Sequence, residues 1–257
     1  MRLLRETKEM IVFVSFFSIA LVILVGVPIR KSFAMSNVNL SFDSAVFTHP
    51  LTIDNPYMPL VVGTTYLYRS ETEDGTEEDT VIVTNQKNKL GGVKCRAVSD
   101  VVTLTNEVLD HEPTEVTTDW YAQDDDGNVW YCGEDTVEYI FDDDFNKIGE
   151  STESSWNADE PGAEPGIAML ANPMIGDSYR QEFLEDVAED MAKVLRLDAT
   201  VSIEFGDFDN CLETKEWTPL EQGSIEHKYY YPSVGLVYNT VLSGGKTVKV
   251  ELVDITP

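Results

Sequence analysis

Hydrophobic and polar residues alternate along much of the chain beyond residue 57, and this period of two predicts β-strands with one face turned to water. The clearest stretches are residues 115–122, 200–205 and 247–254. In the last of these, Val248, Val250 and Leu252 fall on the face expected to point inward. In the first, the alternation separates Val116, Thr118, Trp120 and Ala122 from Glu115, Thr117, Asp119 and Tyr121.

Four short segments with the chemistry of tight hairpin turns separate the strand-like runs. They are Glu73-Asp74-Gly75, Gly91-Gly92, Asp126-Gly127-Asn128 and Gly244-Gly245. About a dozen short strands joined in this way form an antiparallel meander. Such a meander hides its edges by closing into an incomplete, lipocalin-like barrel or by curling round a helix. The sequence therefore predicts a mainly β fold with one curved sheet.

One segment departs from the alternation and predicts a helix. Residues 181–196 place apolar side chains at the spacing of an amphipathic helix, namely Leu184, Val187, Ala188, Met191, Val194 and Leu195. Ser178 and Gln181 have the spacing of a capping box. Acidic residues precede basic ones along the segment, as the helix dipole favours. We expect one helix here, packed through Val187 against the open face of the sheet.

The first 34 residues form a separate segment. Residues 10–29 contain no charged residue, and a helix of that length spans the roughly 30 Å hydrocarbon core of a bilayer. Basic residues precede the run and Ser32-Phe33-Ala34 resembles a signal-peptidase site, so a cleaved signal peptide and a transmembrane anchor both fit. In either case we expect an extended leader over residues 35–56 and a single extracytoplasmic domain over residues 57–257. Membrane contact is then limited to the N-terminal segment.

The chain is strongly acidic, with 46 Asp and Glu against 18 Lys and Arg and a net charge of −28. This charge excludes nucleic-acid binding through phosphate neutralisation, and it favours a soluble monomer. In an exported domain, the simplest arrangement of Cys95, Cys132 and Cys211 is one disulfide and one free thiol, with the pairing left open.

Several motifs with a specific spacing of aromatic residues and glycines run through the domain. They are DWYAQD at 119–124, GNVWY at 127–131, GED at 133–135, GDSYRQE at 176–182, TKEWTPL at 214–220, YY at 229–230 and VGLV at 234–237. Over residues 55–255 the chain thereby resembles a family of exported bacterial and archaeal proteins of unknown function. The resemblance implies export and a single domain, and it implies no activity, ligand or catalytic residue. Residues 157–159, Asn-Ala-Asp, stand where that family is usually rich in glycine.

An acidic turn offers a candidate calcium site. Asp124, Asp126 and Asn128 supply the hard oxygen donors that Ca²⁺ takes in proteins. The turn lacks the full spacing and the terminal glutamate of an EF-hand. Asp-Gly-Asn is also good hairpin-turn sequence, and this plainer interpretation is favoured. No cofactor other than calcium is expected.

Candidate catalytic residues are Glu182 and Glu189, which share a face of the predicted helix with Glu185, together with His227, and Asp190 lies on or beside the same helix. A solvated polar face explains the carboxylates equally well, and a strand histidine is more often structural than catalytic. Candidate ligand-binding residues are mostly aromatic, because aromatic rows on a concave sheet face stack on sugars or enclose apolar ligands. They are Trp120, Trp130, Tyr131, Tyr179, Arg180 and Tyr229. Packing within the core is the plainer alternative.

Three functional hypotheses follow from the sequence. The first is a binding module at the cell envelope for a small apolar or carbohydrate-like ligand, held in the hollow of the sheet. The second is a hydrolase or lyase that uses carboxylates with or without calcium, and the third is a passive surface or matrix protein. An enclosed apolar cavity would favour the first, converging carboxylates with raised pKa values the second, and a filled interior the third.

Overall fold

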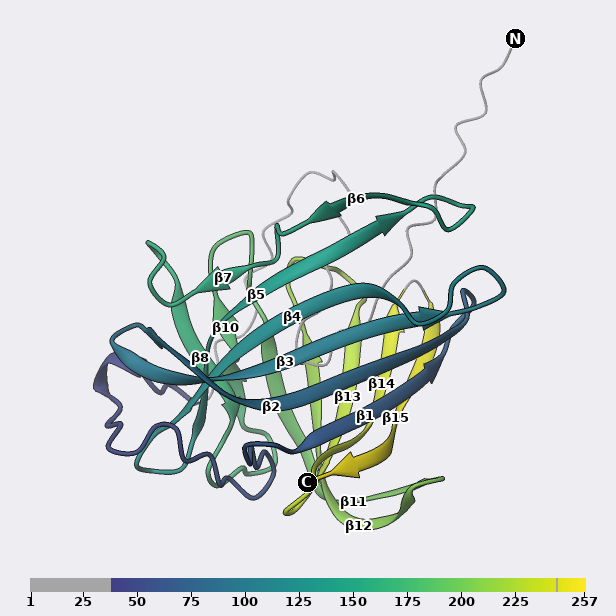
Figure 1. The fold of residues 1–257 in the computed structure, drawn as a ribbon. Helices are drawn as coiled ribbons and strands as arrows, with labels where there is room; N and C mark the ends of the chain where they lie inside the picture. The colour runs from purple at the N-terminus through teal and green to yellow at the C-terminus, as the bar shows by residue number, and fades with distance from the viewer. Residues whose placement is uncertain (1–37, 244) are drawn as a thin grey trace.

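The fifteen strands in the described part of the protein form one antiparallel sheet in a computed structural model that describes residues 38–243 and 245–257 (Figure 1). Along the chain they are β1 (Thr65–Glu71), β2 (Thr76–Leu90), β3 (Val93–Thr105), β4 (Glu112–Gln123), β5 (Val129–Phe141), β6 (Lys147–Ser151), β7 (Trp156–Asn157), β8 (Glu164–Met169), β9 (Ser178–Arg180), β10 (Glu182–Phe183), β11 (Met191–Ile203), β12 (Gly206–Trp217), β13 (Ile225–Tyr231), β14 (Gly235–Ser243) and β15 (Lys246–Thr256).

Strands that follow one another in the chain lie side by side in most of the sheet, whose order is β10-β8-β5-β4-β3-β2-β1-β15-β14-β13-β12-β11-β9. The first strand of the meander, β1, pairs with the last, β15. The two ends of the order, β9 and β10, are linked through one residue, Gln181. Because β9 pairs with β11 and β10 with β8, the sheet bends round until it is nearly closed. The predicted antiparallel meander and its barrel-like form are confirmed.

The first three predicted hairpin turns connect β1 to β2, β2 to β3 and β4 to β5, and β14 pairs with β15. Gly75, in the first of them, has a φ of +143°, and a Cβ there would lie 2.3 Å from the carbonyl oxygen of Thr105. Only glycine fits such a position without moving the neighbouring turn. Residues 153–177, which show no hydrophobic period in the sequence, contain the two short strands β7 and β8.

The helix predicted over residues 181–196 is wrong. The segment instead forms β10, a tight turn and the start of β11. In that turn Leu184 N donates to Ala188 O at 2.7 Å, and Asp186 has a φ of +61°, which interrupts any helix. From Met191 onward the strand pairs with both β12 and β9. This pairing on both edges prevails over the local apolar spacing, because helical stability depends mainly on tertiary packing.

The apolar helix predicted within residues 10–29 lies outside the described residues. Within them, the one helical element is the short 3-10 turn η1 (Phe42–Ser44). No helix in the described range is long and apolar enough to cross a membrane.

Cys95, Cys132 and Cys211 are buried free thiols, so the expected disulfide is absent. Cys95 lies on β3 and Cys132 on β5, and β4 separates them. Burial raises the pKa of the Cys132 thiol well above its ordinary value, and a hydrogen bond with the Cys95 thiol adds to the effect. These two thiols instead share a small apolar cluster on the outer side of the sheet with Trp120 and Leu90.

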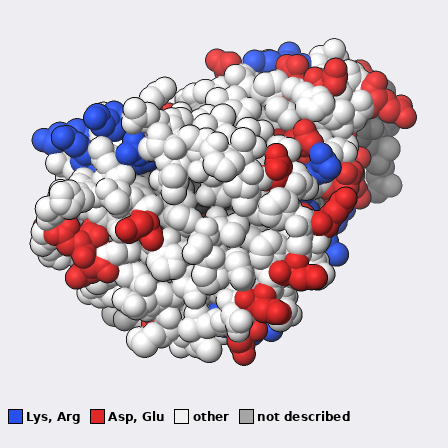
Figure 2. Space-filling model, turned by 60° about the horizontal axis from the view of Figure 1, so that its bottom comes forward, with Lys and Arg blue, Asp and Glu red and all other residues white. Residues whose placement is uncertain are grey.

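The acidic residues are unevenly distributed between surface and interior. On the face shown in Figure 2, Asp and Glu side chains lie mainly toward the edges, around a broad centre of uncharged residues. Another group of carboxyl groups is buried inside the sheet. The interior therefore has two parts, an apolar core with Val83, Val98, Leu212 and Leu252, and an acidic part that forms the candidate site.

Candidate functional site

Ten carboxyl groups line one part of the interior, and each belongs to a residue at most 9% exposed. They come from β2, β3, β4, β5, β10, β12, β13 and the segment before β11. We call them the acidic interior: Glu77, Asp79, Asp100, Glu115, Asp119, Glu134, Glu182, Asp190, Glu216 and Glu226.

Strand alternation places these carboxyl groups inside. On β2, Glu77 and Asp79 lie on the same face as the core residues Val81 and Val83. On β4 the alternation predicted from the sequence is present, but its more polar set points inward. Asp119 therefore lies on the inner face of β4, the same face as Tyr121.

One ammonium group lies among these carboxyl groups. Lys228 Nζ is 3.0 Å from Glu216 Oε2 and 3.1 Å from Glu226 Oε2. Burial acts to lower the pKa of Lys228, but the charges and hydrogen bonds of these two carboxylates outweigh it, so the pKa is raised. Lys228 is therefore a charged ammonium that is matched mainly to two of the ten carboxyl groups.

Other carboxyl groups of the acidic interior raise one another's pKa values, although Lys228 also acts on Asp119 and Asp190. Burial raises the pKa of Asp119 well above its ordinary value, and the charges of Asp100 and Glu134 add to the effect. Burial likewise raises the pKa of Glu182, with further increases from Asp190 and Glu134. Burial raises the pKa of Asp190 to about 7, although Lys228 opposes the shift.

Neutral donors stabilise part of this group. Tyr131 donates its hydroxyl hydrogen to Asp119 Oδ1 at 2.6 Å, and Trp156 Nε1 donates to Glu182 Oε2 at 2.7 Å. The other oxygen of Asp119, Oδ2, has no hydrogen-bond partner among the described residues. Asp119 is fully buried, and a buried unpaired acceptor costs about 1–3 kcal/mol, more when it is charged.

A small cavity of about 10 Å³ lies against these carboxyl groups. Its walls are Tyr121, Tyr131, Ala168, Gln181, Glu182, Asp190, Glu216 and Tyr230. The volume matches about one water-sized group. Gln181, the half-buried link between β9 and β10, donates from Nε2 to Glu216 Oε2 at 3.2 Å. The cavity therefore lies beneath the line along which the sheet closes.

The aromatic residues predicted to bind a ligand lie in different places. Tyr131 lines the cavity, and Tyr179 is buried in the core. Trp120 belongs to the small cluster against which Phe42 and Phe47 pack, and Trp130, a member of the main core, contacts the same two rings. The other two are Arg180, exposed and near Glu164, and Tyr229, which donates to Glu213.

Of the predicted catalytic residues, Glu182 lines the cavity, with the neighbouring Asp190 beside it. Glu189 accepts a hydrogen bond from the backbone of Asp186 in the turn, away from the cavity walls. His227 lies on the outer face of β13, where its Nδ1 is 2.9 Å from Glu213 Oε1. The structure thus brings Glu182 and Asp190 together and leaves the other two candidates elsewhere.

The carboxylate oxygens of Asp124, in the candidate calcium turn, accept hydrogen bonds from nearby residues of the protein. Asp124 accepts hydrogen bonds from Asn128 N and Nδ2 at 2.8 and 2.9 Å and from Trp130 Nε1 at 2.8 Å. Asp126 is exposed. Across the described ranges, no group of three or more His, Cys, Asp or Glu side chains could hold a metal ion.

Sequence analysis did not single out Glu216 and Lys228. Residues 225–231 alternate Glu226, Lys228 and Tyr230 against Ile225, His227 and Tyr229. That pattern marks two faces but gives no reason to place a lysine and a glutamate inside. One signal could have located Lys228. It alternates in step with Tyr230, so the two side chains lie on the same face of the strand, and a buried tyrosine identifies that face as the inner one.

Comparisons with known proteins give a limited result. No family model matches the sequence, and no curated protein matches it. A crystal structure of a "putative exported protein with YmcC-like fold" from Bacteroides fragilis is 17% identical, covers 79% of this chain and all of that chain, and has a TM-score of 0.42. A "putative lipoprotein" from Parabacteroides distasonis is 11% identical, covers 79% of this chain and 99% of its own, with the same TM-score of 0.42. Likeness at this level supports no conclusion about activity, ligand or location.

Proposed function

We propose that this protein is a binding module that takes a small polar ligand at the cavity beneath Gln181. The observation that supports it is the composition of the cavity wall, in which three carboxyl groups and three tyrosines meet in a space of about 10 Å³. A few converging polar groups beside aromatic surface are typical of small-molecule sites. As expected from the sequence, we further propose that the domain works outside the cytoplasm, at the cell envelope.

Of the two ligand classes expected from the sequence, the polar class fits these walls better than the apolar class. An apolar ligand against Glu182, Asp190 and Glu216 would leave carboxyl groups without hydrogen-bond donors, and each such group costs free energy. A ligand rich in hydrogen-bond donors, as a carbohydrate-like molecule is, would instead satisfy them.

A second candidate function is acid–base catalysis by Glu182 and Asp190. Their adjacency favours it, because two carboxyl groups with raised pKa values can exchange a proton with a substrate. The cavity has room for about one water-sized group, so it can admit one polar group at the end of a ligand but not a glycosidic or peptide bond with the groups on both sides of it. Binding is therefore the preferred proposal.

The test is a calorimetric and thermal-shift screen of the full chain against a panel of small sugars, polyols and amines, with fatty acids as apolar competitors. We expect saturable binding of at least one polar ligand, weakened at least tenfold in Asp190→Asn. The matched control is Glu185→Gln, a neutralised carboxyl that is exposed in the nearby turn, and it should bind as the native chain does. Saturable binding of the fatty acids alone, or of no ligand at all, would reject the proposal.

A further inference from the structure

Positive charge is scarce in the interior. Among the described residues, the buried basic side chains are Arg96 and Lys228. Arg96 lies away from the cavity, where its Nη2 donates to Leu51 O at 3.1 Å and its Nη1 to Asn85 Oδ1 at 3.4 Å. Lys228 is therefore the one ammonium group in the acidic interior, against ten carboxyl groups.

The position of Lys228 shows what kind of group these walls accept. Its ammonium lies between two carboxylates, Glu216 and Glu226, at 3.0 and 3.1 Å. Glu216 also lines the cavity, together with a second pair of carboxyl groups, Glu182 and Asp190. No basic side chain of the described residues lines that cavity.

Aromatic faces complete the resemblance to an ammonium site. Tyr121 and Tyr131 are stacked with centroids 5.0 Å apart, and both line the cavity together with Tyr230. The negative faces of such rings attract cations, and buried ammonium ligands are commonly held by rings and carboxylates together. Asp119 Oδ2, a fully buried oxygen with no hydrogen-bond partner in the part of the chain that the structure describes, lies in the same acidic interior, and Tyr131 donates to the other oxygen of Asp119.

Size separates an ammonium group from the alternatives. An ammonium headgroup is close to a water molecule in size, and the cavity of about 10 Å³ accepts about one such group. A metal ion would need several converging ligands. Among the described residues, no three His, Cys, Asp or Glu side chains are arranged so that they could hold one. An alkyl chain attached to the ammonium would leave past Gln181, the cavity residue that is half exposed.

We propose that the cavity binds the ammonium headgroup of a small primary amine, held between Glu182 and Asp190 as Lys228 is held between Glu216 and Glu226. This inference rests on the proposed binding function and names the chemical class of its ligand. On binding, the amine enters as its ammonium form, and the carboxyl groups that face it give up their protons to the solvent.

The experiment compares n-propylamine, supplied as propylammonium chloride, with its neutral analogue n-propanol and with tetramethylammonium chloride, all at one ionic strength. Titration calorimetry on the full chain at pH 6.5 should give saturable binding of propylammonium at least tenfold tighter than of propanol. Tetramethylammonium, which donates no hydrogen bond and is too bulky for the cavity, should not saturate. Equal binding of both ammonium salts would indicate general charge attraction and overturn the inference.

Two variants locate the site. Glu182→Gln and Asp190→Asn should each weaken propylammonium binding at least tenfold, while the exposed control Glu185→Gln should leave it unchanged. Since Glu182→Gln could impair folding, a second measurement uses the native chain alone. Calorimetry in buffers of different ionisation enthalpy should detect net proton release when propylammonium binds, and binding without proton release would overturn the inference.

The outcomes distinguish this inference from the proposed function. If a sugar or polyol binds saturably and propylammonium does not, the amine inference is wrong and the binding module stands. If neither polar class binds, both are wrong.

Discussion

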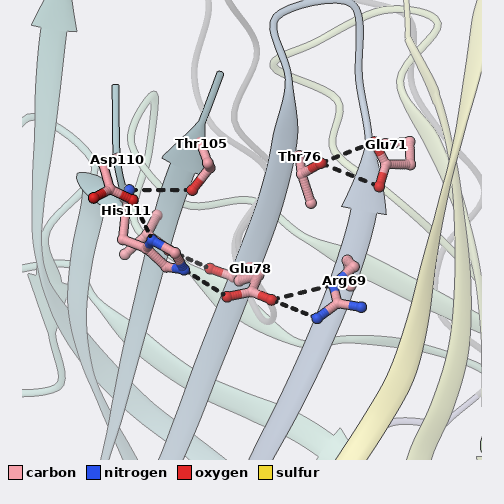
Figure 3. A network of polar contacts seen from close by, with 8 residues as sticks. Arg69, Glu71, Thr76, Glu78, Thr105, Asp110 and His111 are labelled. Atoms are coloured by element: carbon pink, nitrogen blue, oxygen red, sulfur yellow. Dashed lines mark hydrogen bonds and ion pairs between the residues drawn. The ribbon is translucent and has the colours of Figure 1, made fainter. Parts of the chain in front are cut away.

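The two faces of strand β2 place neighbouring carboxyl groups in opposite surroundings. On the outer face, Arg69 Nη2 lies 2.7 Å from Glu78 Oε1 and His111 Nε2 lies 3.4 Å from Glu78 Oε2 (Figure 3). On the inner face, Glu77 and Asp79 are 3% and 5% exposed. Their polar neighbours are uncharged or acidic, Ser70 for Glu77 and Asp100 for Asp79.

Compensation of negative charge therefore differs across a single layer of sheet. Outside, water and basic side chains compensate the carboxylates. Inside, burial is the largest cause that raises the pKa of both Glu77 and Asp79 to about 7, so protons compensate much of the charge. We infer that groups on the inner face make the free energy of unfolding depend strongly on pH and on the loss or addition of a cation. Groups on the outer face should affect the free energy of unfolding only weakly.

The largest expected effect comes from removing the interior ammonium group. Lys228→Met leaves Glu216 and Glu226 buried without their cation, and breaking a buried ion pair in this way costs about 3–5 kcal/mol. Lys246→Met is the matched control, because Lys246 pairs with Glu73 at 2.6 Å on the exposed surface. Urea denaturation at pH 7 should show a loss for the control of less than about 1 kcal/mol. Similar losses in the two variants would contradict the contrast between the faces.

The native chain should lose stability as pH rises from about 4 to about 7. Glu77, Asp79 and Asp190 each have a pKa of about 7 in the fold, whereas unfolded carboxyl groups titrate near 4. Between these values the fold holds protons that the unfolded chain has released, so the free energy of unfolding falls with pH and levels off above 7. Each of the three groups contributes about 2–3 kcal/mol between pH 5 and pH 8, so urea denaturation should show the chain more stable at pH 5 by several kcal/mol. A higher stability at pH 8 would contradict the protonated interior.

Sequence periodicity predicted the sheet well, because alternation of polar and apolar residues is a local property that identifies a strand without knowledge of its partners. The hairpin at Gly75 and the inward face of residues 247–254 were predicted correctly, with Leu252 fully buried. Alternation cannot say which of two faces is inside when both contain polar residues, as in residues 115–122. There the usual preference for apolar interiors would turn Asp119 outward, yet it is fully buried.

The helix error and the partial view of the site share one physical cause. Residues 181–196 satisfy a helical spacing, but they also contain Ala192 and Val194 on either side of the exposed Lys193, which is a strand pattern. Pairing with β9 and β12, which are distant in sequence from one another, decided between the two. The same long-range pairing brings Glu182 and Glu216 to one cavity. The local order of polar and apolar residues contains no information about which distant strands come together.

A smaller effect is expected from neutralising an inner carboxyl group. Asp79→Asn removes a group that must ionise at a cost above pH 7, and its Oδ1 has no hydrogen-bond partner among the described residues. At pH 8 the variant should therefore be more stable than the native chain by about 1–2 kcal/mol, and at pH 5 the gain should vanish. Thermal unfolding followed by circular dichroism at both pH values measures the change. A variant that is destabilised more at pH 8 than at pH 5 would show that Asp79 is ionised and stabilised in the fold.

The smallest expected effect is on the outer face of the same strand. Glu78→Gln removes the pairing with Arg69, whose side chain is 46% exposed against 20% for Glu78. Such surface pairs contribute about 0.2–1 kcal/mol, and salt screens them because the Debye length falls to about 3 Å at 1 M. Urea denaturation should therefore show a loss below about 1 kcal/mol in dilute buffer that disappears in 1 M NaCl. The Asp79→Asn gain at pH 8 should persist in the same salt, since ions reach a buried group poorly. If salt abolished both effects equally, the inner carboxyl groups would be as accessible to solvent ions as the outer ones, and the proposed difference between the faces would not hold.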